Sequence, residues 1–118
     1  MSQTNTQMSV NEFYPRWLVA TEKGEDCIIV DVRSPGEYSK GHVPSARLLP
    51  LDSLPGAAHV IARDKPVYLI CQGGMRSLQA MDYLAREHGL ANLVNITGGT
   101  MAWINAGYPV KQGGHDGS

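Results

Sequence analysis

The chain has 118 residues, a length typical of one compact domain. Its formal charge of −1 argues against a nucleic-acid partner, because such proteins carry an overall basic charge or a basic patch. No stretch approaches the roughly 18 consecutive apolar residues of a membrane span, so we expect a soluble protein without a membrane partner.

The N-terminal segment predicts a helix. Residues 1–7 are polar, and we expect them to be loose and flexible. Ser9 and Glu12 have the spacing of a capping box, in which two side chains satisfy free amides at a helix start. The helix should end near Gly24, and Pro15 should delay its start or kink it, because proline removes a backbone hydrogen bond.

Four short apolar runs predict strands. A continuous apolar run rich in β-branched residues is typical of a strand that is covered on both faces. The predicted strands occupy residues 27–32, 47–49, 67–70 and 93–96. Residues 51–63 are expected to be partly helical, with a break at Pro55-Gly56.

Two helices should follow the last two strands. Residues 75–88 form the clearest helix, with Gly89 in the position of a C-cap. Its predicted apolar face consists of Met75, Leu78, Met81, Leu84 and Ala85. A last helix should follow Gly98-Gly99 and stop at residues 107–109, before a flexible tail over 111–118. Strands that alternate with helices predict an α/β fold, a parallel sheet with helices on both faces.

Cysteine and histidine usage bears on compartment and on metal binding. The chain has two cysteines and four histidines, His42, His59, His88 and His115. Two unpatterned cysteines fit a reducing compartment and are too few for a four-cysteine zinc site. The histidines lack the i, i+4 spacing of a metal pair, and the N-terminus lacks the features of a secretory signal. We therefore expect a cytoplasmic protein without a metal or cofactor.

The segment after the third predicted strand has the features of an activated cysteine. Ligands of parallel sheets bind at the carboxyl ends of the strands, and Cys71 lies at such an end. Gly73 and Gly74 permit the positive φ angles of a tight turn, in which backbone amides and a helix N-terminus can point at the sulfur. Arg76 adds a cation. Together these features predict a lowered thiol pKa and a nucleophilic thiolate, where a lone buried cysteine would be inert.

Three segments resemble the signatures of rhodanese-type sulfurtransferases. Residues 71–77, Cys-x-x-Gly-x-Arg-Ser, are similar to the active-site loop of that family. Residues 31–46 are similar to its first signature, although Ser45 stands where the family more often has glycine. Residues 97–110 are similar to its closing signature. The three segments occur in order, so we predict a rhodanese domain over residues 8–110.

The resemblance implies a five-stranded parallel sheet and a two-step sulfur transfer. Cys71 would take sulfane sulfur from a small donor such as thiosulfate or a persulfide, or from a protein persulfide. An acceptor such as cyanide or a thiol would then remove the sulfur from the Cys71 persulfide. Arg76 would orient an anionic donor, although it is the only charge of the loop, which leaves the donor open. The residues implied to hold the persulfide are Gln72, Gly73, Gly74, Met75, Arg76 and Ser77.

Residues outside the loop are expected to support the site. Asp31 and Arg33 end the first long strand, and they could bond to the active loop or pair with Glu37. His42 should satisfy a nearby backbone group or carboxylate, because the transfer needs no general base. Cys27 should be a core residue, with a role as resolving cysteine as the alternative.

Two other functions fit parts of this pattern. Cysteine phosphatases and arsenate reductases also hold a thiolate in an amide nest closed by arginine, but with a longer loop than the four residues between Cys71 and Arg76. A rhodanese-like domain can also act as a non-catalytic binding module, although such modules lack the cysteine. No large apolar stripe is left over for a partner, so we expect a monomer or a weak dimer.

Overall fold

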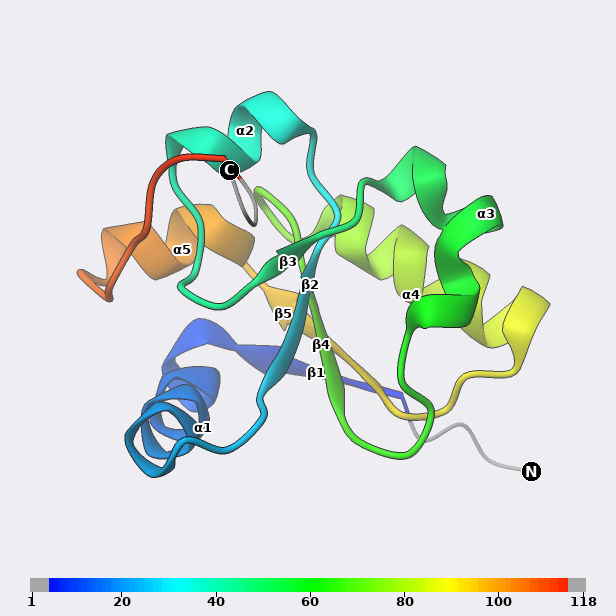
Figure 1. Ribbon diagram of the computed structural model, residues 1–118, viewed down its shortest axis with the longest axis horizontal. Helices are drawn as coiled ribbons and strands as arrows, with labels where there is room; N and C mark the ends of the chain where they lie inside the picture. Colours follow the sequence, from blue (N-terminus) through cyan, green and yellow to red (C-terminus); the bar gives the residue numbers. More distant parts are fainter. Residues whose placement is uncertain (1–4, 115–118) are drawn as a thin grey trace.

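A computed structural model describes residues 5–114 and contains a sheet of five parallel strands (Figure 1). The strand order is β1-β5-β4-β2-β3, and every pairing is parallel. The strands are β1 (Thr6–Ser9), β2 (Ile28–Asp31), β3 (Arg47–Leu48), β4 (Val67–Ile70) and β5 (Leu93–Thr97). All four residues of β4 are buried, as its continuous apolar sequence predicts.

Helices cover both faces of the sheet (Figure 1). They are α1 (Val10–Lys23), α2 (Pro35–Lys40), α3 (Leu54–Ala57), α4 (Met75–His88) and α5 (Gly99–Asn105), with 3₁₀ turns at Leu51–Ser53 and Ala58–Val60. On one face Phe13 of α1 and Trp103 of α5 are fully buried against Ile96 of the sheet. On the other face Leu54 and Leu84 pack with Leu69. The predicted α/β fold class is confirmed.

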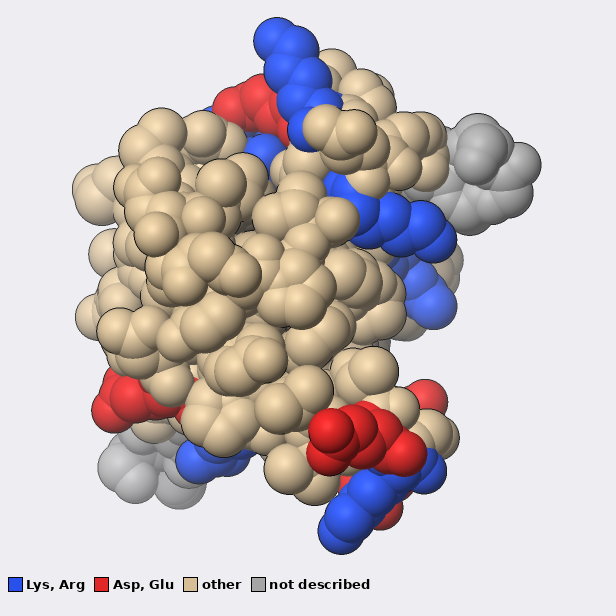
Figure 2. Space-filling model, turned by 90° about the vertical axis from the view of Figure 1, so that its left-hand side faces the viewer, with Lys and Arg blue, Asp and Glu red and all other residues tan. Residues whose placement is uncertain are grey.

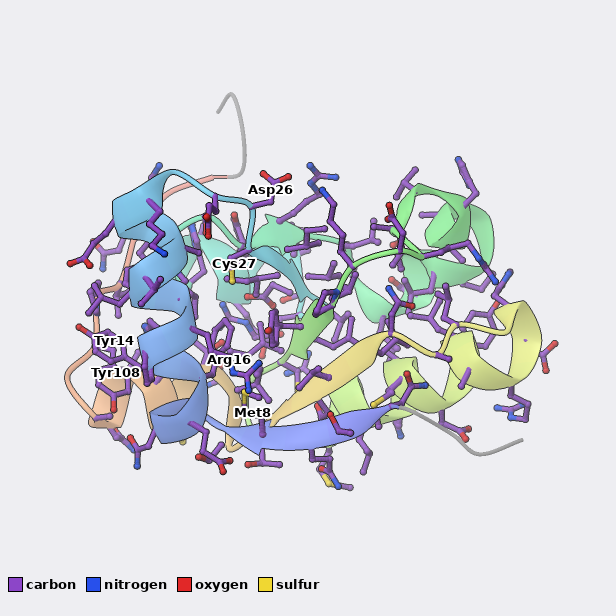
Figure 3. All side chains as sticks on the ribbon, turned by 90° about the horizontal axis from the view of Figure 1, so that it is seen from below. Met8, Tyr14, Arg16, Asp26, Cys27 and Tyr108 are labelled. Carbon is purple, nitrogen blue, oxygen red and sulfur yellow. The ribbon has the colours of Figure 1, made fainter. Side chains whose placement is uncertain are left out.

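Aromatic stacking joins the end of the domain to its first helix. The rings of Tyr14 and Tyr108 are nearly parallel, with centroids 4.1 Å apart (Figure 3).

Seen from the left-hand side of Figure 1, uncharged side chains cover most of the surface, and charged ones gather toward its edges (Figure 2). Within the described residues, no helix combines the length and hydropathy that a bilayer crossing requires.

The predicted capping box at the start of α1 is present. The Glu12 amide donates to the Ser9 hydroxyl, and the Ser9 amide donates to the Glu12 carboxylate. The helix begins at Val10 and runs through Pro15, so the predicted delay is wrong. Burial of Phe13 and Trp17 against the sheet outweighs the single backbone hydrogen bond that proline removes.

Both ends of the described chain are more ordered than the sequence predicts. The expectation that residues 1–7 are loose is wrong for Thr6 and Gln7, which pair with β5 in β1. Polar, exposed edge residues give no apolar pattern from which to predict a strand. Lys111 forms an antiparallel bridge with His42, so the predicted flexible tail is paired there. Residues 1–4 and 115–118, also predicted to be flexible, lie outside the described residues.

Two details of the helices differ from prediction. Pro55 and Gly56 lie inside α3 and do not break it, because proline is tolerated in the first turn of a helix. The side chain of Met75, predicted to be on the apolar face of α4, is 69% exposed. The residues of α4 that are fully buried are Ser77, Ala80 and Leu84. The buried face of α4 therefore differs from the predicted one, and Ser77 in its first turn contacts the Cys71 sulfur.

Ser45 adopts a left-handed backbone conformation, with a φ of 77°. A side chain is strained in this region, whereas glycine is not. We expect Ser45→Gly to raise the free energy of unfolding by about 0.5 kcal/mol, because relief of strain exceeds the added entropy of the unfolded chain. Urea denaturation measures this change. Ser45→Ala keeps the strained φ and should not be stabilised in this way. An equal increase in the free energy of unfolding with alanine would show that relief of backbone strain is not the cause.

Candidate active site

Cys71 follows β4 directly and is almost completely buried, with 1% of its surface exposed. Its sulfur accepts hydrogen bonds from the loop and from the helix that follows it. The Gly74 amide lies 3.0 Å from Sγ, and the Ser77 hydroxyl lies 3.3 Å from it. These donors belong to the loop and to the first turn of α4, so the predicted amide cradle is present around the sulfur.

The two glycines of the loop have different roles. Gly74 has a φ of 105°, and a Cβ there would lie 3.1 Å from the backbone nitrogen of Gly98. Gly74 is therefore required both by its conformation and by close packing. The expectation of a positive φ at Gly73 is wrong, and a Cβ at Gly73 would meet no atom within 4 Å.

The surroundings of Cys71 favour its thiolate. Burial alone would raise the pKa of this thiol. Hydrogen bonds from the Ser77 hydroxyl and from the amides of Ser77, Gly74 and Gly73 outweigh burial, so the pKa of Cys71 is lowered. The thiolate is the nucleophilic form of cysteine, so the loop prepares Cys71 for attack on an electrophilic sulfur.

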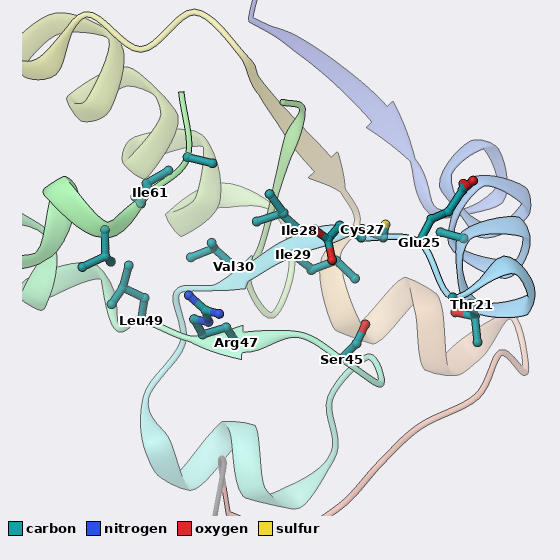
Figure 4. A pocket seen from close by; sticks show the side chains of 15 residues that line it. Thr21, Glu25, Cys27, Ile28, Ile29, Val30, Ser45, Arg47, Leu49 and Ile61 are labelled. Atoms are coloured by element: carbon teal, nitrogen blue, oxygen red, sulfur yellow. The ribbon is translucent and has the colours of Figure 1, made fainter. Parts of the chain in front are cut away.

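Cys27 has the opposite character. It lies half-buried beside α1, where burial raises the pKa of its thiol to about 11 (Figure 3). Together with Ser45 and Arg47 it lines a cavity of about 570 Å³ beside the amino end of β2 (Figure 4). The expectation that Cys27 is a core residue is confirmed only in part, because the side chain is half-buried and packs against the core from outside.

The alternative that Cys27 resolves Cys71 within one molecule is wrong. Ile28 pairs with Val67 and Asp31 pairs with Ile70, so Cys27 precedes the paired region and Cys71 follows it. A separation of about five residues along parallel strands corresponds to roughly 16 Å. A disulfide requires Cα atoms within about 7 Å.

The opposite pKa shifts predict selective alkylation. As pH rises, the reaction of Cys71 with iodoacetamide should increase at a lower pH than for an ordinary thiol, because its thiolate forms earlier. Cys27 should stay largely unmodified until the pH approaches its pKa of about 11. Peptide mapping by mass spectrometry across a pH series measures both profiles. If alkylation of the two cysteines rose at the same pH, the opposite shifts of their pKa values would be contradicted.

Asp31 and Arg33 connect the end of β2 to the active loop. The Arg33 guanidinium donates to the Asp31 carboxylate at 2.8 Å and to the Gln72 side-chain oxygen at 3.0 Å. It also donates to the Gly41 carbonyl at 2.8 Å. Both charged residues are buried, with exposed fractions of 0% for Asp31 and 3% for Arg33. The structure thus brings the pair to the loop through Gln72, and the alternative of a partnership with Glu37 is wrong.

Glu37 pairs instead with Arg76. Each terminal guanidinium nitrogen of Arg76 lies 2.8 Å from one carboxylate oxygen of Glu37. This hydrogen bonding is the main reason that the pKa of Glu37 falls to about 2. The sequence analysis missed Glu37 as a site residue, although its place three residues after Ser34 marks a second capping box. The cation predicted to orient a donor is therefore already paired.

The start of α5 holds the active loop from behind, and sequence analysis did not assign this role. The Thr100 amide donates to the Cys71 carbonyl at 2.8 Å, and the Met101 amide donates to the Gln72 carbonyl at 3.0 Å. A Cβ on Gly99 would lie 2.5 Å from the Cys71 carbonyl oxygen, so only glycine fits. The Gly98-Gly99 pair in the closing signature was the available signal for this contact.

His42 lies outside the reacting groups. Its side chain is buried, and its Nδ1 lies 2.7 Å from the Tyr38 carbonyl oxygen. Its ring stacks on that of Tyr38 with centroids 3.7 Å apart. The expectation that this histidine satisfies a backbone group is confirmed. Its backbone also forms the bridge with Lys111, which ties the segment after α2 to the segment after α5.

Comparison with known proteins gives a consistent family assignment. The model of the rhodanese-like domain matches residues 14–106. A protein named sulfurtransferase from Allochromatium vinosum is 37% identical over 86 residues, which cover 73% of this chain and 79% of the relative. The thiosulfate sulfurtransferase GlpE of Pseudoalteromonas translucida is 36% identical over 90 residues, which cover 74% of this chain and 81% of the relative.

A solved structure shows the same fold. The crystal structure of a rhodanese-related protein from Thermoplasma volcanium is similar with a TM-score of 0.77 at 29% identity. The likeness covers 90% of this chain and 97% of that chain. The rhodanese-like fold is therefore shared with a solved structure over most of this chain.

Proposed function

Because the chain belongs to the rhodanese-like domain family, we propose that it is a sulfurtransferase that carries sulfane sulfur as a persulfide on Cys71. The observation that carries this proposal is the pair of hydrogen bonds from Gly74 and Ser77 to the Cys71 sulfur. The names of the relatives support the same activity. A reducing, cytoplasmic location fits this function, because the thiolate would stay free of disulfides there.

In the first step the Cys71 thiolate attacks the outer sulfur of a donor. One sulfur–sulfur bond forms to Cys71 while the sulfur–sulfur bond of the donor breaks. With thiosulfate as donor the leaving group would be sulfite. With an alkyl persulfide as donor it would be the corresponding thiol or thiolate. The terminal sulfur on Cys71 then carries the negative charge, which the amides of the loop and the N-terminus of α4 stabilise.

In the second step an acceptor attacks the terminal sulfur. Cyanide would take up the sulfur and be released as thiocyanate, whereas a thiolate would be released as a new persulfide. In both cases the Cys71 thiolate is the leaving group and is regenerated. Neither step requires a proton from a histidine, which agrees with the place of His42 away from the sulfur hydrogen bonds. We propose small-molecule donors and acceptors, with a protein persulfide as a further donor, and a monomer or weak dimer.

The position of Arg76 argues against the phosphatase-like alternative. Four residues separate Cys71 from Arg76, which is fewer than such enzymes place between their cysteine and arginine, so the cradle suits a sulfur better than a tetrahedral oxyanion. The presence of Cys71 with a lowered pKa argues against a purely non-catalytic binding module.

Intact-mass measurement tests the proposal. The protein is incubated with excess thiosulfate, and in parallel with 2-hydroxyethyl persulfide, and is then treated with cyanide. We expect a gain of one sulfur atom that cyanide removes. The Cys27→Ser protein should gain the same sulfur, because Cys71 is then its only cysteine. Absence of any gain with both donors would overturn the proposal.

A further inference from the structure

The charges around the active loop are paired before any donor binds. Two guanidinium groups lie at the loop, those of Arg33 and Arg76. The Arg33 guanidinium forms a 2.8 Å ion pair with Asp31 while it contacts Gln72. The Arg76 guanidinium forms a two-point ion pair with Glu37, at 2.8 Å for both contacts. Each cation at the site is thus matched by one carboxylate.

The Glu37 carboxylate is held firmly in this position. It occupies the third position of α2, where the Ser34 amide donates to its Oε1 at 3.1 Å. The two-point geometry with Arg76 is the strongest arrangement of a guanidinium and a carboxylate. With a pKa near 2, Glu37 stays ionised throughout the neutral pH range. An incoming anion must therefore compete with a permanent charge for Arg76.

Donors differ in the negative charge that they bring to this site. When the Cys71 thiolate attacks thiosulfate, the reacting groups carry three negative charges, one on the thiolate and two on the donor. After the transfer these charges lie on the Cys71 persulfide and on sulfite. When it attacks a neutral alkyl persulfide, the reacting groups carry only the one negative charge of the thiolate, because the donor's proton leaves with the thiol. Cys71 is 1% exposed, so water screens the charge on its sulfur poorly, whereas Arg76 and Glu37 are 38% and 34% exposed and are partly screened.

The surface beside the loop fits a donor with an apolar part. Met75 begins α4 directly after the loop, and its side chain is 69% exposed. Met101 donates its amide to Gln72 of the loop, and its side chain is 50% exposed. Flexible methionine side chains adapt to varied apolar groups.

We propose that Glu37 is a specificity-determining residue, whose pairing with Arg76 makes the site prefer alkyl persulfides of low charge over thiosulfate. This inference rests on the proposed function, because it names the donor class of the same Cys71 site. Glu37 acts by neutralising Arg76, the cation of the active loop. Removal of the Glu37 charge releases the cation for a dianionic donor.

Glu37→Gln tests the inference. Glutamine at this position preserves the capping box of α2, so the variant should fold as the parent does. We expect kcat/KM for persulfide formation from thiosulfate to rise about tenfold, because Arg76 loses its paired carboxylate and is free to attract the dianion. The value for 2-hydroxyethyl persulfide should stay within about twofold, since a neutral donor does not respond to the charge of Arg76.

Two further variants make the outcome specific. Glu22→Gln removes the same charge from an exposed position on α1 and should change neither value. Glu37→Gln combined with Arg76→Gln should lose the gain with thiosulfate, because no cation is released. An unchanged ratio of the two donors in Glu37→Gln would overturn the role of Glu37. Failure of both donors to load Cys71 in the parent would overturn the proposed function and this inference with it.

Discussion

Replacing Cys71 with serine is expected to abolish sulfur transfer, with a loss of at least about a thousandfold in turnover. A serine hydroxyl cannot form the persulfide, and it stays protonated at neutral pH. The hydrogen bonds that lower the pKa of Cys71 by favouring the thiolate cannot compensate for this difference. Thiocyanate production from each active donor and cyanide measures the loss.

The fold should survive this substitution, which makes the result interpretable. Serine is smaller than cysteine and can accept the hydrogen bonds from Gly74 and Ser77. The thermal midpoint of Cys71→Ser should therefore lie close to that of the parent protein. Cys27→Ser serves as the matched control and should retain turnover, because Cys27 lies at the other end of the sheet. Transfer that persisted in Cys71→Ser would place the sulfur on another residue.

Gly99→Ala is expected to destabilise the protein by about 3 kcal/mol and to reduce transfer strongly. The new Cβ would lie 2.5 Å from the Cys71 carbonyl oxygen and 2.6 Å from that of Gln72. Backbone atoms cannot rotate away as a flexible side chain can. The active loop must therefore shift, which disturbs the bonds from Thr100 and Met101. Urea denaturation and persulfide formation measure the two effects.

Gly24→Ala is the matched control for this substitution. Gly24 has a φ of 68°, close to the 62° of Gly99, but a Cβ there would meet no atom within 4 Å. Its replacement adds only the strain of the left-handed conformation, about 1 kcal/mol, and should leave transfer unchanged. Equal losses of stability in the two variants would show that the contact between α5 and the active loop is unimportant.

Several features of the site follow from local sequence. The continuous apolar run before Cys71 predicts a buried strand, and the glycines and helix after it predict a cradle at the strand end. Both are confirmed, because they depend on neighbouring residues and on general properties of parallel sheets. The capping box at Ser9 and the end of α1 at Gly24 are likewise local and are confirmed.

The edge of the sheet could not be predicted in this way. Thr6 and Gln7 gain their strand conformation by pairing with β5, which lies almost ninety residues further along the chain. Their side chains are polar and exposed, so no alternation of apolar residues marks them as a strand. Lys111 is ordered for the same reason, through a bridge to His42. A polar segment that pairs through its backbone with a distant segment has no local sequence pattern from which the pairing could be predicted.

The sequence by itself determined the α/β class, the place of Cys71 at a strand end and the means of lowering its pKa. Only the tertiary structure decided how the charges at that site are matched. Glu37 meets Arg76 across 39 residues of sequence, and Gly99 meets the carbonyl of Cys71 across 28. Ion pairs and close packing form between side chains and backbone that the fold brings together, and their partners are set by geometry that no local pattern encodes.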